Sequence, residues 1–94
     1  MKIVIDIDGI IALGGAPFKN CYPVYPIIGK IKYLKNRGHK IILFTSRRES
    51  DREITKSWLK KHEVRYDKLM MGKPLGDVYL DDRNINLPKF LMLR

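Results

Sequence analysis

Two short apolar runs rich in β-branched residues constrain the fold of this chain more than any other feature. They span residues 2–7 and 40–44, and each is followed by polar or turn-forming residues. Apolar runs of this length are typical of parallel strands that are buried on both faces. Weaker runs of the same kind follow at residues 68–71 and 78–80. The sequence therefore predicts four short strands.

A first helix is predicted between the first two strands. Pro26 suits the first turn of a helix, because the amide hydrogen that proline lacks would have no partner there. Three apolar residues then recur on one helical face: Ile27, Ile31 and Leu34. Gly38 stands where helices commonly end, since glycine adopts the left-handed backbone without steric cost.

A second helix is predicted between the second and third strands. Ser50 and Glu53 form a capping-box pattern, in which each side chain satisfies a free amide at the helix start. The apolar stripe of this helix consists of Ile54, Trp58 and Leu59. Trp58 is expected to be a core residue.

Alternation of strands and helices indicates an α/β fold with a small, mostly parallel sheet. Right-handed crossovers place consecutive strands side by side, so the expected strand order is 3-2-1-4, with the last strand beside the first. A chain of 94 residues is long enough for one domain, which we expect to span residues 1–94.

Residues 9–25 interrupt this alternation. The segment contains Gly14, Gly15, Pro17 and Pro23, so it is not expected to form a helix. It is also too long for a simple turn, and loops of this length in small domains are usually functional or mobile.

Composition narrows the class of protein. The chain carries a net charge of +9, and its single cysteine, Cys21, excludes an internal disulfide. Asp6 and Asp8 interrupt the apolar N-terminus, which argues against a signal peptide or a membrane span. We therefore expect a cytoplasmic protein without membrane contact. The positive charge favours polyanionic partners, nucleic acid among them.

Polar residues of catalytic type gather at the carboxyl ends of the predicted strands. In open parallel sheets, ligands bind outside these ends. Asp6, Asp8 and Gly9 stand at the end of strand one, and Thr45, Ser46 and Arg47 follow strand two. Gly72 and Lys73 follow strand three, and Asp81 and Asp82 follow strand four.

The order of these motifs, Asp-x-Asp-Gly, Thr-Ser, Lys and Asp-Asp, resembles the signature of the haloacid dehalogenase (HAD) superfamily. It is also similar to the matching motifs of 5′-nucleotidases and polynucleotide phosphatase domains. The resemblance implies a three-layer, Rossmann-like core. The segments where family members insert a cap domain are short here, so a capless form is expected. Ile10 departs from the family, in which many members have Thr at this position.

The resemblance also implies a mechanism. Asp6 would be the nucleophile that forms an aspartyl-phosphate, with Mg²⁺ bridging it to the phosphate. Asp6, the backbone carbonyl of Asp8, and Asp81 would hold the metal. Asp82 would bind it directly or orient one of its waters. Asp8 would also act as general acid and then as general base.

The remaining motif residues would bind the phosphoryl group. Thr45 would donate a hydrogen bond to it, helped by the Ser46 amide, and Lys73 would neutralise its charge. Gly9, Ser46 and Arg47 are the expected substrate contacts. For Arg47, as for its neighbour Arg48, contact with solvent is the competing expectation.

Three functions compete at this stage. The leading one is a Mg²⁺-dependent phosphatase for a large or polyanionic substrate, a nucleotide or a phosphosugar. A response-regulator receiver is disfavoured, because its phosphorylated Asp would follow the third strand, where Lys73 stands instead. A catalytically inactive, HAD-like basic module that binds nucleic acid or a protein is the alternative.

Two further expectations concern the surface of the protein. Tyr22, Tyr25 and Tyr33 are interpreted as packing residues of the loop and the first helix. The apolar tail at residues 87–93 either exposes a patch that forms a homodimer or folds back onto the sheet of a monomer.

Overall fold

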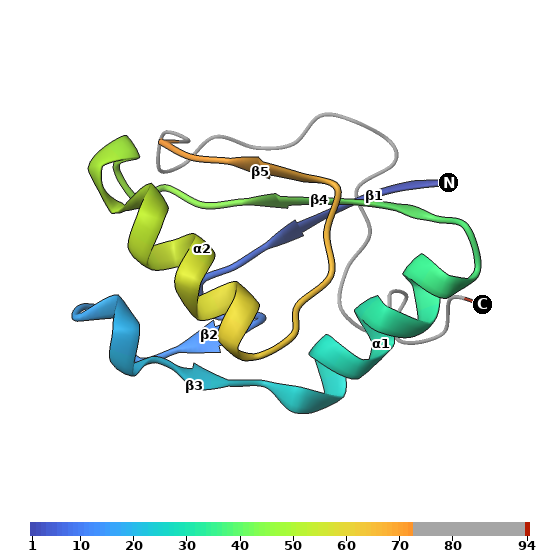
Figure 1. The fold of residues 1–94 in the computed structure, drawn as a ribbon, viewed down its shortest axis with the longest axis horizontal. Helices are drawn as coiled ribbons and strands as arrows, with labels where there is room; N and C mark the ends of the chain where they lie inside the picture. Colours follow the sequence, from blue (N-terminus) through green and yellow to red (C-terminus); the bar gives the residue numbers. More distant parts are fainter. Residues whose placement is uncertain (73–93) are drawn as a thin grey trace.

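The structure, a computed structural model, describes residues 1–72 and residue 94. Three parallel strands form its main sheet in the order β1 (Lys2–Asp6), β4 (Lys40–Phe44) and β5 (Lys68–Met70). Two helices, α1 (Tyr25–Asn36) and α2 (Arg52–Lys61), connect them and lie on the same side of the sheet (Figure 1). The predicted α/β class with a mostly parallel sheet is confirmed.

The three described strands have the relative order predicted for strands one to three. The predicted fourth strand, at residues 78–80, lies outside the described residues. The complete order 3-2-1-4 and the third layer of a HAD core therefore stay predictions. The tail at residues 87–93 also lies outside the described part of the chain.

Alternate residues of β1 and β4 form the centre of the core. Ile3 pairs in register with Ile41, and Ile5 with Leu43, and all four side chains are buried. The predicted core face of α1, Ile27, Ile31 and Leu34, is buried as well, and so is Ile28, which was not predicted. Because the three strands are parallel, their carboxyl ends meet at one edge of the sheet.

The start of α2 differs from the prediction. A 3-10 turn, η2 (Glu49–Asp51), precedes the helix, and no side chain caps the helix start. Ser50 lies inside this turn, so it does not occupy the N-cap position and the predicted capping box is wrong. An ion pair between Glu49 and Arg52 links the turn to the helix instead. Trp58 is buried, as predicted.

Residues 9–25 contain more regular structure than expected. Strands β2 (Ala12–Leu13) and β3 (Tyr22–Pro23) pair as an antiparallel hairpin, and η1 (Phe18–Asn20) forms a 3-10 turn between them. Trp58 anchors the hairpin, because its indole Nε1 donates a hydrogen bond to the Cys21 carbonyl at 3.1 Å. The segment is therefore held against α2.

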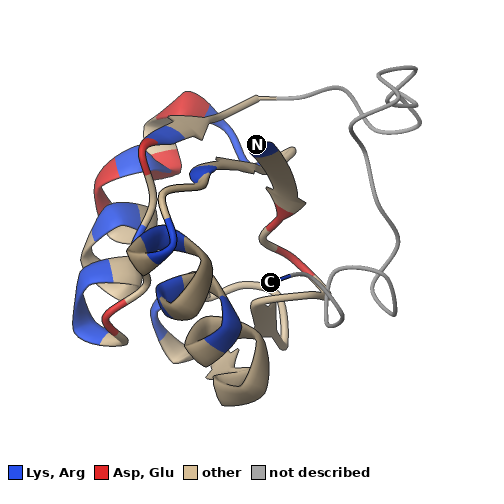
Figure 2. Ribbon diagram, turned by 90° about the vertical axis from the view of Figure 1, so that its right-hand side faces the viewer, with Lys and Arg blue, Asp and Glu red and all other residues tan. Residues whose placement is uncertain are grey.

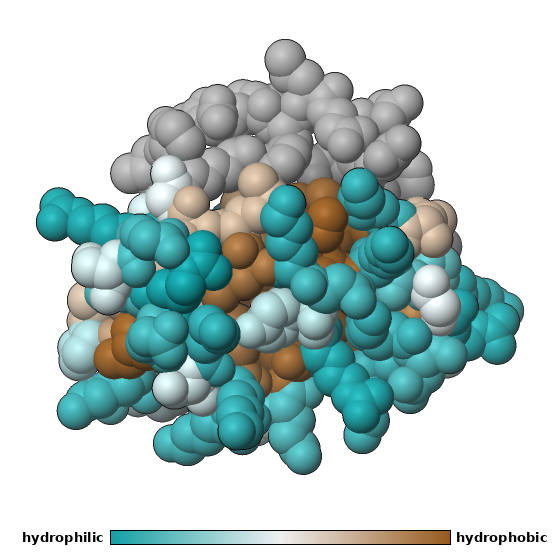
Figure 3. Space-filling model, turned by 45° about the horizontal axis from the view of Figure 1, so that its top comes forward, coloured by the Kyte–Doolittle hydropathy of each residue, from teal (hydrophilic) through white to brown (hydrophobic). Residues whose placement is uncertain are grey.

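Basic residues and apolar residues are unevenly distributed over the described surface. Lys and Arg lie along both helices (Figure 2). Figure 3 shows hydrophilic residues over most of one face and an apolar area at its centre, bordering the residues that are not described. No helix in residues 1–72 is long and apolar enough to cross a membrane.

Asp67 gives the fold a pH dependence. Its carboxylate accepts hydrogen bonds from Lys35 Nζ at 2.6 Å and from the Ile41 amide at 2.7 Å. The Lys35 bond, and after it the amide bond, lower the pKa of Asp67 below its usual value of about 3.9. A carboxyl whose pKa is lowered by folding stabilises the fold above its unfolded pKa and loses this contribution as the pH falls.

We therefore expect Asp67→Asn to flatten the loss of stability between about pH 5 and pH 3. The midpoint of urea unfolding, measured for both proteins across this range, checks the expectation. The variant should start less stable, because it loses the ion pair with Lys35. Its stability should also change less with pH, because the Asn side chain does not take up a proton in this range. Parallel curves for the two proteins would contradict it.

Candidate active site

The carboxyl ends of β1 and β4 meet at one edge of the sheet. Asp6 pairs in register with Phe44, and the Ile7 amide donates to the Phe44 carbonyl at 3.0 Å. Asp6, at the last position of β1, is half-buried. The residues that follow the two strands, Asp8 and Thr45, are thus neighbours, as the convergence of strand ends predicted.

A tight turn after Ile7 directs Asp8 toward β4. The Ile7 carbonyl accepts the amides of Ile11 and Ala12, both at 2.9 Å. Gly9 has a φ of 88°, a backbone conformation that residues other than glycine rarely adopt. This conformation permits the sharp turn, and the predicted contact of Gly9 with substrate stays a prediction.

The Asp8 carboxylate is held by two residues of the segment after β4. Thr45 Oγ1 donates to Asp8 Oδ2 at 2.6 Å. Arg47 donates to Asp8 Oδ1 from Nη2 at 2.7 Å and from Nε at 3.1 Å. The Arg47 side chain is only 2% exposed, whereas that of Asp8 is 37% exposed. Both carboxylate oxygens are therefore held, while the group stays partly accessible.

Arg47 is buried among groups from several other elements. Its Nη1 donates to Thr55 Oγ1 of α2 at 3.0 Å, and its guanidinium lies 3.9 Å from the centre of the Phe18 ring. Nη2 also lies 3.8 Å from the buried Cys21 thiol. The expectation that Arg47 faces solvent is wrong. In the described structure its side chain positions Asp8, and its predicted contact with substrate stays a prediction.

Thr45 is fully buried and its hydroxyl is engaged on both sides. Besides donating to Asp8, Thr45 Oγ1 accepts a hydrogen bond from the Arg47 amide at 3.1 Å. The Thr45 amide donates to the Met70 carbonyl of β5 at 3.0 Å. A direct bond from Thr45 to a phosphoryl group, as predicted from the resemblance, would require its hydroxyl to leave Asp8.

A cleft of about 640 Å³ lies beside Asp8. Ser46 and Arg48 line one part of it and are exposed, and residues 14–16 and Phe18 line another. The side chain of Arg48 makes no hydrogen bond or ion pair with any described residue, so its charge is available to an anion. Asp6 is not among the described residues that line the cleft.

Of the predicted metal ligands, the structure describes only Asp6 and Asp8. Asp81 and Asp82, together with the predicted catalytic Lys73, lie outside the described residues. Within residues 1–72 and 94, no three carboxylate, thiol or imidazole side chains gather in a group that could hold a metal ion. The predicted magnesium site, which includes Asp81 and Asp82, therefore stays a prediction.

Sequence reasoning missed the groups that hold Arg47. Thr55 looked like an ordinary helix residue and Phe18 like a loop residue. Nothing in the sequence pattern pairs either of them with Arg47. Only the packing of α2 and η1 around this guanidinium identifies them.

Comparison with known proteins adds structural relatives. No protein-family model matches the chain, and no curated protein matches it in sequence. The crystal structure of an MCSG target from Vibrio cholerae matches with a TM-score of 0.78 at 24% identity, covering 99% of this chain and 89% of that chain. At this identity the similarity establishes a shared fold.

Two further matches come from structures of the Pnkp1/Rnl/Hen1 complex, one described as an RNA repair complex. Both are 29% identical to this chain, with TM-scores of 0.70 and 0.69, and cover 86% and 84% of it. The matched part makes up only 30% and 28% of those chains. The chain therefore spans less than a third of the length of these relatives.

Proposed function

We propose that this chain is a Mg²⁺-dependent phosphomonoester hydrolase of the HAD type, with Asp6 as its nucleophile. The observation that carries the proposal is the Asp8 carboxylate, fixed by Thr45 and Arg47 at the edge of an open cleft. Asp6 lies two residues before it, at the end of β1. The order of motifs along the chain and the similarity to chains of the Pnkp1/Rnl/Hen1 complex support the same class.

The proposed reaction has two steps. A carboxylate oxygen of Asp6 attacks phosphorus, and the bond from phosphorus to the leaving oxygen breaks as the leaving oxygen takes a proton from Asp8. Water then attacks phosphorus in the aspartyl-phosphate and gives a proton to Asp8. The bond from phosphorus to the Asp6 oxygen breaks, so phosphate is released and the Asp6 carboxylate is restored. Thr45 and Arg47 keep the Asp8 carboxylate in one orientation during both steps.

The metal fits the chemistry of the proposed ligands. All of them supply oxygen, which Mg²⁺ prefers, and Asp6 is a half-buried carboxylate at the carboxyl end of a strand. The Asp8 carboxylate is already bonded to Arg47 and Thr45, so the backbone carbonyl of Asp8 is the better donor. Asp81 and Asp82 would complete the set. When bound, Mg²⁺ would offset the repulsion between Asp6 and a phosphate anion.

An open cleft suits a large phosphorylated substrate. Arg48 and Ser46 are exposed on its wall and would contact the phosphate or the group next to it. The net charge of +9 favours a polyanion. One similar chain belongs to a structure described as an RNA repair complex, which favours a nucleic-acid end over a phosphosugar. A multi-subunit setting of this kind would also fit this chain.

Asp8→Asn should separate the two steps of the reaction. With an activated aryl phosphate, whose leaving group needs no proton, the variant should still phosphorylate Asp6. Hydrolysis of the intermediate should slow by about 10²-fold or more, because general base catalysis is lost. Rapid-quench measurement of protein-bound phosphate tests this. A variant with wild-type rates in both steps would exclude an acid–base role for Asp8.

Mg²⁺ should stabilise the fold, because a ligand that binds only the native state raises its stability by mass action. At a concentration about 100 times the dissociation constant, the gain is about 2.7 kcal/mol. The melting midpoint in a Mg²⁺ titration measures it. Asp81→Ala should remove the shift, whereas Asp67→Asn, a charge change away from the site, should keep it. A flat titration curve for the unaltered chain would contradict the metal site.

An inactive basic module that binds nucleic acid or a protein remains the second candidate. The net charge of +9 favours it. A module without catalysis, however, needs no carboxylate held by a buried arginine beside a cleft. Mg²⁺-dependent turnover of a generic aryl phosphate would exclude this candidate.

A further inference from the structure

Four exposed residues of η1, the hairpin and the two helices define what we term the tyrosine–lysine surface: Lys19, Tyr22, Tyr25 and Lys61. Tyr22 is 73% exposed and Tyr25 is 61% exposed. The interpretation of Tyr22 as a packing residue is therefore wrong, and Tyr25, also mostly exposed, packs through its contact with His62. Cys21, next to Tyr22, and Ile27, two residues after Tyr25, are buried in the core instead.

The two lysines face one shallow hollow. It has a volume of about 130 Å³, and Lys19 of η1 and Lys61 of α2 both line it. The other lining residues are Ile54, Ser57 and Trp58. None of these described residues is acidic, and neither lysine forms an ion pair with another described residue. Lys35 differs, because Asp67 pairs with it.

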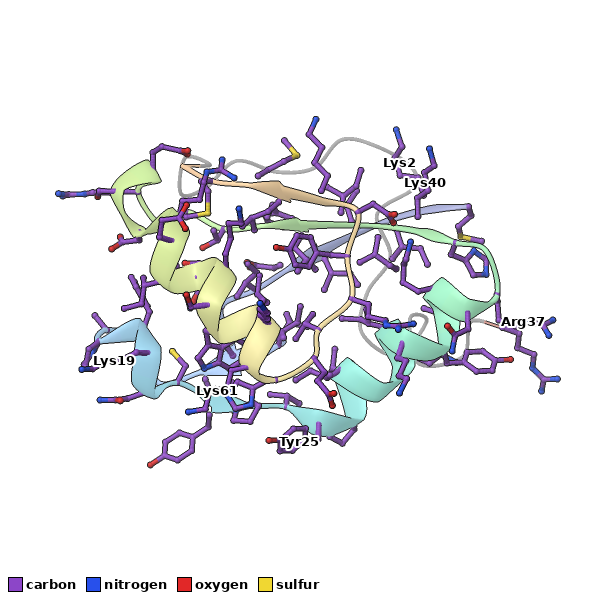
Figure 4. All side chains as sticks on the ribbon, in the orientation of Figure 1. Lys2, Lys19, Tyr25, Arg37, Lys40 and Lys61 are labelled. Carbon is purple, nitrogen blue, oxygen red and sulfur yellow. The ribbon has the colours of Figure 1, made fainter. Side chains whose placement is uncertain are left out.

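Aromatic contacts connect this hollow to Tyr25. The ring of Trp58 lies 4.5 Å from the ring of His62, which in turn lies 6.1 Å from the ring of Tyr25. Burial, and after it the charge of Lys61, lower the pKa of His62, which favours the uncharged form of this ring. Figure 4 shows Lys19, Lys61 and Tyr25 along the same lower edge of the molecule.

The hollow adjoins the candidate active site. Phe18 lines the cleft, and the next residue, Lys19, lines the hollow, so η1 forms the boundary between the two. Tyr22 follows on β3, directly after Cys21, whose carbonyl bonds Trp58. An extended polymer that leaves the cleft across η1 would contact the lysines first and then the exposed tyrosine rings.

We propose that the tyrosine–lysine surface binds single-stranded nucleic acid, with phosphates at Lys19 and Lys61 and a base stacked on Tyr22. The inference rests on the proposed phosphatase function in one respect, since it names the substrate whose phosphorylated end would enter the cleft. Unpaired bases have free faces for aromatic rings, and lysines neutralise the backbone. An acidic protein would use the lysines but would leave the exposed ring of Tyr22 without a role.

Fluorescence anisotropy of the full chain tests the surface directly. The probes are fluorescein-labelled oligouridylate and oligothymidylate of about twelve nucleotides, both without terminal phosphates, and a duplex of equal length. Removing the terminal phosphate makes binding independent of the cleft chemistry. We expect both single strands to bind more tightly than the duplex. Equal or tighter binding of the duplex would overturn the proposal.

The lysine test compares two double variants with the same loss of charge. Lys19→Ala with Lys61→Ala should weaken binding about tenfold and reduce the slope of log affinity against log salt by about 1.4. Lys2→Ala with Lys40→Ala removes two exposed lysines that pair in register on β1 and β4, at another edge of the molecule in Figure 4. This control variant should change the affinity by less than about twofold. Equal losses in both variants would overturn the proposal.

The aromatic test compares two exposed tyrosines. Tyr22→Ala should weaken binding about fivefold or more, because it removes a stacking platform. Tyr33→Ala, on α1, is the control and should leave affinity unchanged. If Tyr22→Ala has no effect while heparin, a polyanion without bases, competes as well as oligouridylate, the surface is a general anion or acidic-protein site and the proposal is wrong.

The two proposals fail separately. A chain that binds oligonucleotides but hydrolyses no phosphomonoester would support the tyrosine–lysine surface and contradict the phosphatase. A chain that hydrolyses an aryl phosphate but binds neither single strand at low salt would support the phosphatase and overturn the surface.

Discussion

Asp6→Asn is expected to lower kcat for every phosphomonoester by at least about 10³-fold, because the amide cannot attack phosphorus. The side chain keeps its size and is only half-buried, so the fold should persist. Phosphate release in the presence of Mg²⁺, together with the melting midpoint, separates lost chemistry from lost structure. The control is Asp67→Asn, the same substitution at a carboxylate that bonds Lys35 and the Ile41 amide.

Two outcomes would contradict the role of Asp6. One is an Asp6→Asn protein that is folded and retains near wild-type turnover. The other is an equal loss of turnover in Asp67→Asn, since that carboxylate lies just before β5 and bonds Lys35 and the Ile41 amide at the other end of the strands.

Arg47→Ala is expected to cost about 2–3 kcal/mol of folding free energy. Removing one partner of a fully buried ion pair costs about 3–5 kcal/mol, and the 37% exposure of Asp8 places this pair below that range. The change leaves the Thr55 hydroxyl without its donor and opens space beside Phe18. Turnover should fall as well, because Asp8 would be held by Thr45 alone.

Urea unfolding of Arg47→Ala and Arg48→Ala measures this effect. The two substitutions remove the same charge from adjacent residues, but Arg48 is exposed at the cleft. Its replacement should change stability by less than about 0.5 kcal/mol. Equal stability of the two variants would show that the buried guanidinium does not organise the site.

The main sheet could be predicted because its strands depend on local pattern. β4 has the predicted bounds, and β1 and β5 each end one residue before the prediction. The hairpin of β2 and β3 could not be predicted, because strands of two residues are too short to show alternation. Glycines and prolines around them gave only a loop signal.

The candidate site was predicted in part for a similar reason. Parallel strands bring their carboxyl ends together, so the proximity of Asp8 and Thr45 followed from the order of elements. The burial of Arg47 did not follow, because it depends on Thr55 of α2 and Phe18 of η1, which no local pattern pairs with it. The exposure of Tyr22 depends on the hairpin and was missed with it.

The most direct test of the account is release of inorganic phosphate from p-nitrophenyl phosphate by the full chain, with Mg²⁺ and with excess EDTA. This small substrate needs only the cleft and the proposed Asp6–Asp8 chemistry. The account predicts turnover with Mg²⁺, loss of turnover with EDTA, and recovery when Mg²⁺ is restored in excess. A folded chain that releases no phosphate above the buffer rate at any Mg²⁺ concentration would contradict it.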